Sequence, residues 1–217
     1  MRENTKKQIE VLLQRYPVLQ PCKESIVETV ETLIQAYRQE KKLLVCGNGG
    51  SAADSLHIVG ELMKGFVLPR TLPEDFQQKL RDTAPDSAEY LIRNLQGALP
   101  AVSLVSETAL STAYANDQAP DLAFAQQVMG QGKTGDILLA ISTSGNSANV
   151  LYAAQVAKAI GIRVVGLTGV GGGKLKNWSD VLIAVPEKET YRIQELHLPV
   201  YHAVCLALEE EFFGGNA

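Results

Sequence analysis

A glycine-rich stretch close to residue 50 constrains the fold more than any other part of the chain. The apolar run Leu43–Cys46 is typical of a buried strand, and it leads into the turn Gly47–Gly50, which holds three glycines and an asparagine. Ser51 predicts the N-cap of a following helix, on which His57 and Glu61 share one face because four residues separate them. Free backbone N–H groups point out of such a turn, so it predicts a site for an anion such as phosphate. A tight turn in an ordinary α/β sheet accounts for the same residues about equally well, because a glycine-rich turn is a weak signal.

Strands and helices alternate along the rest of the chain. Apolar runs predict further strands at residues 101–105, 136–141, 162–167 and 181–185, and the segments between them have helical patterns. This alternation predicts an α/β protein with a central parallel sheet and helices on both of its faces. The sequence contains no internal repeat, long linker or low-complexity tract, so we expect one domain over residues 1–217.

Two segments lie outside this alternation. Residues 1–40 predict two amphipathic helices ahead of the first strand, with no sheet of their own to cover, so we expect them to form a helical interface with another subunit. Residues 68–98 are interrupted by prolines and have polar helical stretches. That pattern predicts a helical insertion or a lid rather than part of the sheet.

Charge and apolar patterning argue against two kinds of partner. A net charge of -4 at pH 7 leaves no basic footprint for nucleic acid. The first residues lack the apolar core of a secretory signal, and no apolar run is long enough to span a bilayer, so we expect a cytoplasmic protein that binds no membrane. Cys22, Cys46 and Cys205 are odd in number and widely spaced, which favours buried free thiols over disulfides.

A second loop carries the stronger anion signal. Between a buried strand and a helix, six residues hold four hydroxyl side chains: Ser142, Thr143, Ser144 and Ser147. Hydroxyl and backbone donors at a helix N-terminus suit a phosphate monoester, whose oxygens accept hydrogen bonds. The loop has no Lys or Arg, which excludes a P-loop nucleotide site, and neither loop has the spacing of a dinucleotide site. Simple helix capping is the alternative, although it needs only one hydroxyl.

The histidines give a less direct signal. His57 and Glu61 have a spacing compatible with one metal ion, while Gln194 and His202 lie eight residues apart on a long predicted helix. Eight helical residues rise about 12 Å, so these two side chains reach a common point only if both lean inward. The sequence holds three histidines, His57, His197 and His202, and a histidine near an apolar helix face is more often a packed core residue.

Three motifs in this order resemble the phosphoheptose isomerases, a family of sugar isomerase (SIS) domain enzymes. The motifs are Gly47–Ser51 with His57 and Glu61, Ile141–Val150, and Arg192–Glu195 with His202. The resemblance covers most of the chain and implies a three-layer α/β/α, flavodoxin-like doubly wound fold. It also implies a cytoplasmic homotetramer with active sites between subunits, which converts sedoheptulose 7-phosphate to D-glycero-D-manno-heptose 7-phosphate.

The resemblance also implies roles for individual residues. His57, Glu61, Gln194 and His202 match the ligands of one zinc ion per subunit, and Glu61 and His202 match the proposed catalytic base and its acid–base partner. The residues that match substrate contacts are Asn48, Gly49, Gly50, Ser51, Asn116, Asp117, Ser142, Thr143, Ser144, Ser147 and Gln194.

Two departures from the family pattern put the exact sugar in doubt. Tyr191 stands where an Asp is usual, and residues 68–98 are longer than the usual connection. An isomerase of another sugar phosphate therefore stays open. So does a non-catalytic SIS protein, either a sugar-phosphate sensor or a scaffold that associates with a replication initiator. Glu61 and His202 favour the enzyme, because aldose–ketose isomerisation through an enediol needs a base and an acid.

Overall fold

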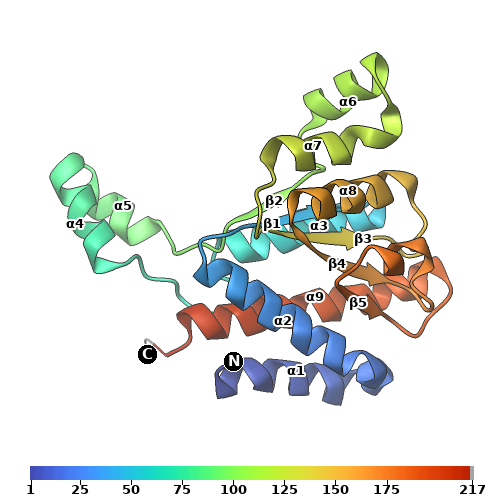
Figure 1. The fold of residues 1–217 in the computed structure, drawn as a ribbon. Coiled ribbons are helices and arrows are strands. Elements are labelled where there is room, and N and C mark those ends of the chain that lie inside the picture. Colours follow the sequence, from blue (N-terminus) through green and yellow to red (C-terminus); the bar gives the residue numbers. More distant parts are fainter. Residues whose placement is uncertain (216–217) are drawn as a thin grey trace.

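The computed structural model describes residues 1–215, and within them a single five-stranded parallel sheet forms the centre of the molecule (Figure 1). Its strands stand in the order β2-β1-β3-β4-β5. They are β1 (Leu43–Cys46), β2 (Ala101–Ser103), β3 (Ile137–Ile141), β4 (Arg163–Thr168) and β5 (Val181–Ala184). The predicted strands are confirmed, that of β1 with identical bounds and the others within one or two residues at each end.

The strand order reverses between β1 and β3. The chain leaves β1 for β2 on one side and then continues to β3 on the other side, where Leu43 pairs with Ile137. In open α/β sheets, ligands bind outside the carboxyl ends of the strands at such a switch point. The turn at residues 47–50 follows β1 and the hydroxyl loop at residues 142–147 follows β3, so both lie there.

Helices cover both faces of the sheet, which confirms the three-layer α/β/α architecture. The helices are α1 (Glu3–Arg15), α2 (Lys23–Arg38), α3 (Gly50–Met63), α4 (Glu74–Thr83), α5 (Ala88–Asn94), α6 (Thr108–Asp117), α7 (Ala123–Gln131), α8 (Ala148–Ile160) and α9 (Thr190–Phe213). Short 3₁₀ turns occupy Pro17–Cys22, Pro120–Leu122 and Gly173–Asn177. Successive strand residues point to opposite faces. Leu139 therefore packs with α2, α3 and α9, whereas Leu138 packs with α7 and α8.

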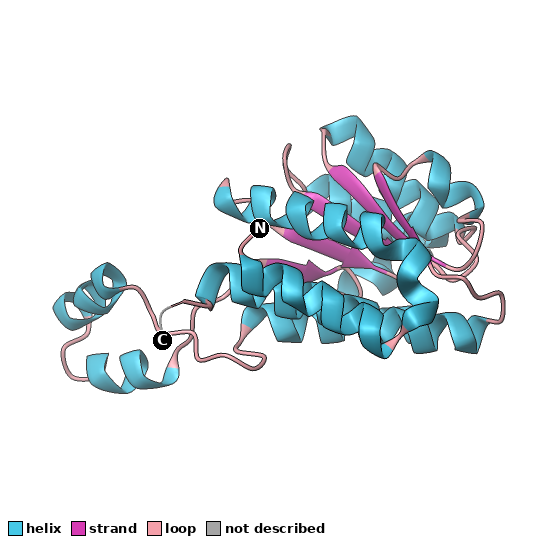
Figure 2. Ribbon diagram, turned by 90° about the horizontal axis from the view of Figure 1, so that it is seen from below, coloured by secondary structure: helices cyan, strands magenta, loops and turns pink. Residues whose placement is uncertain are grey.

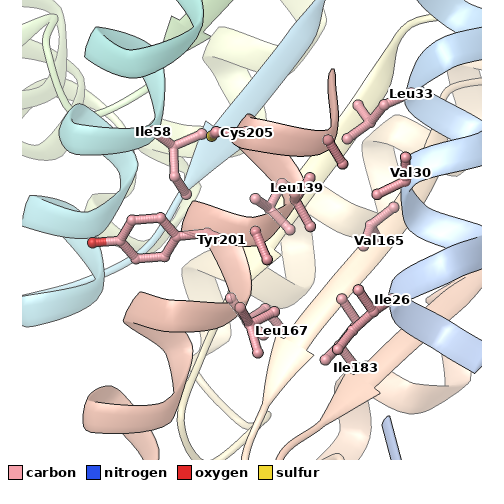
Figure 3. Close-up of a cluster of buried hydrophobic side chains, with 14 of the residues drawn as sticks. Ile26, Val30, Leu33, Ile58, Leu139, Val165, Leu167, Ile183, Tyr201 and Cys205 are labelled. Carbon is pink, nitrogen blue, oxygen red and sulfur yellow. The ribbon is translucent and has the colours of Figure 1, made fainter. Parts of the chain in front are cut away.

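The expectation that neither N-terminal helix has a sheet to cover is wrong for α2. Ile26, Val30 and Leu33 of α2 are buried against Val165 and Ile183 of the sheet (Figure 3). Of the two N-terminal helices, α1 is the one that does not cover the sheet. It packs instead along α9 and α2 (Figures 1 and 2).

The predicted helix cap is also wrong. The N-cap of α3 is Gly49 rather than Ser51, because the positive φ of Gly49 (57°) lets the helix begin two residues earlier. Ser51 lies buried in the first turn instead.

The segment at residues 68–98 holds two short helices that project from the body of the molecule (Figures 1 and 2). No residue of α4 is buried, and Ala88 is the buried residue of α5. All three cysteines are buried and free, as expected. Among residues 1–215, no helix combines the length and the apolar character needed to cross a membrane.

Candidate active site

The two predicted anion loops meet at the switch point of the sheet. Asn48, in the turn after β1, exchanges two amide hydrogen bonds of 2.8 and 2.9 Å with Asn149 in the first turn of α8. This pair joins residues that lie 101 positions apart in the sequence. The glycine turn and the hydroxyl loop therefore form one continuous polar edge.

The hydroxyl loop does not use its side chains to cap α8. Ser147 is the N-cap residue but makes no capping hydrogen bond; its hydroxyl lies 3.0 Å from that of Ser142. The Ser144 hydroxyl accepts from the backbone N–H of Asn146. Gly145 has a φ of 65° and packs directly on the backbone of the segment that follows β4. Because capping does not explain the four hydroxyls, an anion site at the N-terminus of α8 is the better interpretation.

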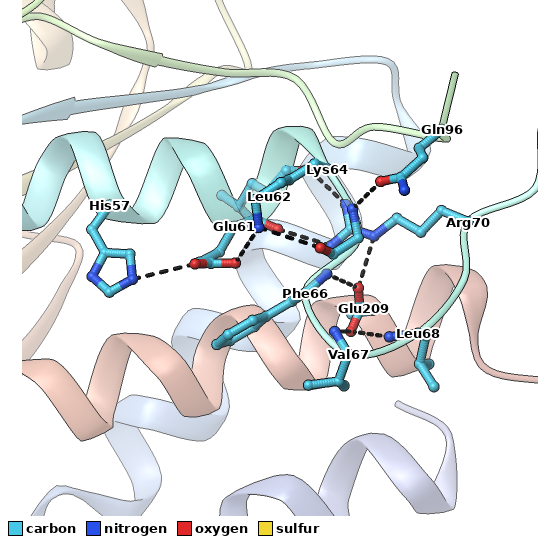
Figure 4. A network of polar contacts seen from close by, with 11 residues as sticks. His57, Glu61, Leu62, Lys64, Phe66, Val67, Leu68, Arg70, Gln96 and Glu209 are labelled. Atoms are coloured by element: carbon cyan, nitrogen blue, oxygen red, sulfur yellow. Dashed lines mark hydrogen bonds and ion pairs between the residues drawn. The ribbon is translucent and has the colours of Figure 1, made fainter. Parts of the chain in front are cut away.

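Three of the four predicted metal ligands gather between α3 and α9, and two of them, Glu61 and His202, are also the predicted catalytic pair. Nε2 of His57 lies 3.3 Å from Oε1 of Glu61 (Figure 4), and the ring centroids of His57 and His202 are 5.0 Å apart. The Glu61 side chain is only 13% exposed, and its second oxygen lies 3.1 Å from Nζ of Lys64. The Phe66 ring covers His202 at a centroid distance of 5.4 Å.

The electrostatics of His202 suit proton transfer. Burial lowers its pKa below the usual 6.5, the neighbouring His57 lowers it further, and Glu61 opposes both effects. His202 is therefore neutral at pH 7, with one ring N–H that can donate a proton and one ring nitrogen that can accept one. Its Nε2 is buried without a hydrogen-bond partner, which is unusual for a ring nitrogen unless a ligand completes the site.

Tyr201 is a residue of the site that sequence reasoning missed. Its hydroxyl lies 3.0 Å from Nδ1 of His57 and donates to Oδ1 of Asp54 at 3.2 Å. Burial raises the pKa of both Asp54 and Tyr201. The one available signal was Asp54 itself, which stands one helical turn before His57 and so shares its face.

Gln194 is not placed with these three side chains. A Cβ atom added to Gly50 would lie 2.5 Å from Nε2 of Gln194, so the Gln194 amide rests against the glycine turn. His57 is seven residues farther along α3, a rise of about 10 Å. Gln194 therefore lies with the predicted substrate loop, in keeping with its second predicted role.

Two predicted substrate contacts, Asn116 and Asp117, lie on the surface, as does Tyr191, which departs from the family pattern. Asn116 and Asp117 are exposed in the last turn of α6, where the Asn116 amide donates to the Asp117 carboxylate at 2.9 Å. Tyr191 is 56% exposed at the start of α9 and accepts a hydrogen bond from Arg192. Within one subunit none of these joins the cluster around His57.

The donor atoms fit zinc, but the side chains do not form a finished metal site. Two imidazoles and a carboxylate are the donors that zinc prefers, and the unpartnered Nε2 of His202 is available as a ligand. Among residues 1–215, however, no three His, Cys, Asp or Glu side chains are placed to share one ion. Closer approach of His57, Glu61 and His202 is needed for binding.

Comparison with known proteins finds relatives of this chain by sequence and by structure. Residues 88–169 match the SIS domain family model. A phosphoheptose isomerase from Clostridium acetobutylicum is 41% identical over 191 residues, which cover 88% of this chain and 84% of that protein. One from Akkermansia muciniphila is 34% identical over 215 residues, 99% of this chain and 100% of that protein. A phosphoheptose isomerase structure from Neisseria gonorrhoeae has a TM-score of 0.69 at 33% identity, over 95% of this chain and 91% of that one.

The sheet order, the hydroxyl loop and these matches define the class of protein as a SIS-domain sugar-phosphate isomerase. Within that class, the chain belongs to the phosphoheptose isomerase family.

Proposed function

We propose that this enzyme converts sedoheptulose 7-phosphate to D-glycero-D-manno-heptose 7-phosphate through an enediol. The observation that carries the proposal is the approach of Glu61 and His57 to 3.3 Å beside His202. The names of the relatives support the choice of a heptose phosphate.

In the proposed mechanism, the phosphate binds to the hydroxyls and backbone N–H groups of residues 142–147. Asn48 of the glycine turn and Gln194, which rests on that turn from α9, contact the sugar. Glu61 removes a proton from C1 of the ketose while His202 donates a proton to the carbonyl oxygen at C2, which gives the enediol. Return of the Glu61 proton to C2 and loss of the O1 proton to His202 complete the aldose.

Zinc is the proposed cofactor, held by His57, Glu61 and His202. Gln194, the fourth ligand implied by the family resemblance, rests on the glycine turn within one subunit and would have to approach this cluster to bind the ion. When bound, it would supply Lewis-acid polarisation of the sugar oxygens. A ligand role lowers the basicity of Glu61, so ligand and base are competing roles for this one carboxylate. Turnover with and without a chelator measures which role dominates.

The proposed assembly is a cytoplasmic homotetramer with sites shared between subunits. A groove between α1 and α9 opens beside His202, and its lining includes Val11 and Leu198, which are 40% and 41% exposed. Apolar side chains at the edge of a site favour coverage by a neighbouring subunit. Sedimentation velocity at assay concentrations tests this, and an active monomer would contradict it.

The experiment that tests the activity incubates the purified protein with sedoheptulose 7-phosphate and measures the aldose formed. Glu61→Gln and His202→Gln are each expected to lower kcat at least about 100-fold while sugar-phosphate binding, measured by calorimetry, is retained. Glu31→Gln, an exposed position on α2, is the matched control. Turnover like that of the wild type in either variant would remove that residue from proton transfer. Retained binding without any turnover in the wild type would favour the non-catalytic sensor.

A further inference from the structure

A fully buried ion pair lies next to the catalytic cluster. Nε of Arg70 donates to Oε1 of Glu209 at 2.9 Å, and both side chains are 0% exposed (Figure 4). Arg70 follows the end of α3, whereas Glu209 lies near the end of α9. A buried ion pair contributes little net stability compared with apolar side chains of similar volume, so its presence here calls for another explanation.

Glu209 organises the bend that follows α3. Its two carboxylate oxygens accept the backbone N–H groups of Phe66 at 2.7 Å, Val67 at 2.9 Å and Leu68 at 3.1 Å. Together with the Arg70 bond, this carboxylate accepts four hydrogen bonds. The chain therefore wraps around Glu209 in one defined conformation, which Figure 4 shows.

Arg70 holds the last turn of α3 from the other side. Its Nη2 donates to the backbone oxygen of Glu61 at 2.9 Å, and its Nη1 donates to that of Leu62 at 2.6 Å. Carbonyl groups in the last turn of a helix have no partner within the helix, so Arg70 satisfies them. One of the two carbonyls belongs to the proposed catalytic base itself.

The same network fixes the cover of the proposed acid. Phe66, whose N–H is bound by Glu209, places its ring 5.4 Å from that of His202. Arg70 and Glu209 thus connect the backbone of Glu61 with the neighbour of His202 through direct hydrogen bonds. The planar guanidinium of Arg70 matters, because a lysine could not donate to three acceptors in these directions.

We propose that Arg70 and Glu209 are positioning residues, which set the place of Glu61 relative to His202 and so support proton transfer. This inference rests on the proposed roles of Glu61 and His202. In this proposal neither Arg70 nor Glu209 contacts the substrate, and both act through the backbone at the end of α3. It predicts a loss in kcat that is larger than any change in KM.

The test compares Arg70→Lys and Glu209→Gln with Arg81→Lys and Glu89→Gln. Arg81 and Glu89 form an exposed ion pair of 2.8 Å in the projecting helices, which makes them matched controls. We expect Arg70→Lys and Glu209→Gln to lower kcat at least tenfold with KM changed less than threefold, at a temperature well below their melting temperatures. A role in folding alone would lower only the melting temperature and would leave kcat as in the wild type, which would overturn the proposal.

A second readout does not depend on the activity. In metal-free protein with labelled histidines, the ring resonances of His57 and His202 are expected to shift in Arg70→Lys and Glu209→Gln but not in Arg81→Lys. If the wild type has no turnover, the proposed function fails and these resonances decide the positioning role alone. Unchanged resonances would then refute it. Arg70→Lys keeps the buried charge, so it carries the test if Glu209→Gln does not fold.

Discussion

The hydroxyl of Tyr201 lies 3.0 Å from Nδ1 of His57. Because this hydroxyl donates its own proton to Asp54, its oxygen is free to accept the proton on Nδ1 of His57. That arrangement fixes the imidazole tautomer and leaves the Nε2 lone pair directed at Glu61, 3.3 Å away. A lone pair and a carboxylate at this separation require a proton or a cation between them, which favours a shared proton or a metal ion in the site.

Tyr201→Phe tests this arrangement. The phenyl ring keeps the packing, but His57 loses the partner that orients it, so we expect zinc affinity and kcat to fall about 10–100-fold. Zinc affinity is measured by competition with a chromophoric chelator. Tyr152→Phe, at an exposed position of α8, is expected to change neither value. Equal zinc affinity and kcat in Tyr201→Phe and the wild type would show that the hydroxyl has no orienting role.

Gly145→Ala tests the hydroxyl loop as the phosphate site. A Cβ atom at this position would lie 2.1 Å from the backbone oxygen of Gly172, and the φ of 65° is strained for alanine. The loop must therefore move, and we expect KM for the sugar phosphate to rise more than tenfold while kcat changes less. Gly130→Ala, where a Cβ meets no atom within 4 Å, is the control. An unchanged KM in a folded Gly145→Ala protein would place the phosphate elsewhere.

His197 predicts a pH dependence of stability. Burial lowers its pKa from 6.5 to about 4; the nearby backbone of Thr168 opposes this, although neither ring nitrogen meets the geometry of a hydrogen bond. Between pH 6.5 and 4 the unfolded chain binds a proton that the folded protein excludes. The stability is therefore fully present above pH 6.5 and is lost as the pH falls towards 4.

His197→Leu is expected to remove this contribution. From pH 7 to pH 5 the free energy of unfolding should fall by about 2 kcal/mol more in the wild type than in the variant. Urea unfolding at both pH values measures the difference. Parallel pH profiles for the two proteins would mean that His197 is protonated in the folded state.

The projecting helices can be removed without loss of the core. Residues 71–95 contribute few buried side chains, and the two ends of the segment already meet, because the N–H of Gly97 donates to the backbone oxygen of Arg70 at 2.8 Å. Replacement by a short glycine–serine linker is expected to shift the melting temperature by less than about 4 °C, measured by calorimetry. Loss of folded protein would instead make these helices part of the core.

Local sequence patterns were sufficient to predict most elements of the fold. The run Leu43–Cys46 predicts β1 with the bounds that the structure has, because an apolar stretch between turn residues is typical of a buried strand. Errors occurred where neighbouring residues compete for one role: Ser51 was expected to cap α3, but the backbone freedom of Gly49 started the helix earlier.

The sequence by itself determined which strands and helices form and which side chains are candidates for the chemistry, because periodicity and side-chain type are local properties. Only the tertiary structure decided that α2 covers the sheet, that Gln194 rests on Gly50, and that Tyr201 reaches His57. The Arg70–Glu209 pair joins residues 139 positions apart and had no signal in the sequence. Contacts of this kind depend on how α3 and α9 pack side by side, and that packing follows from the burial of apolar surface over the whole chain.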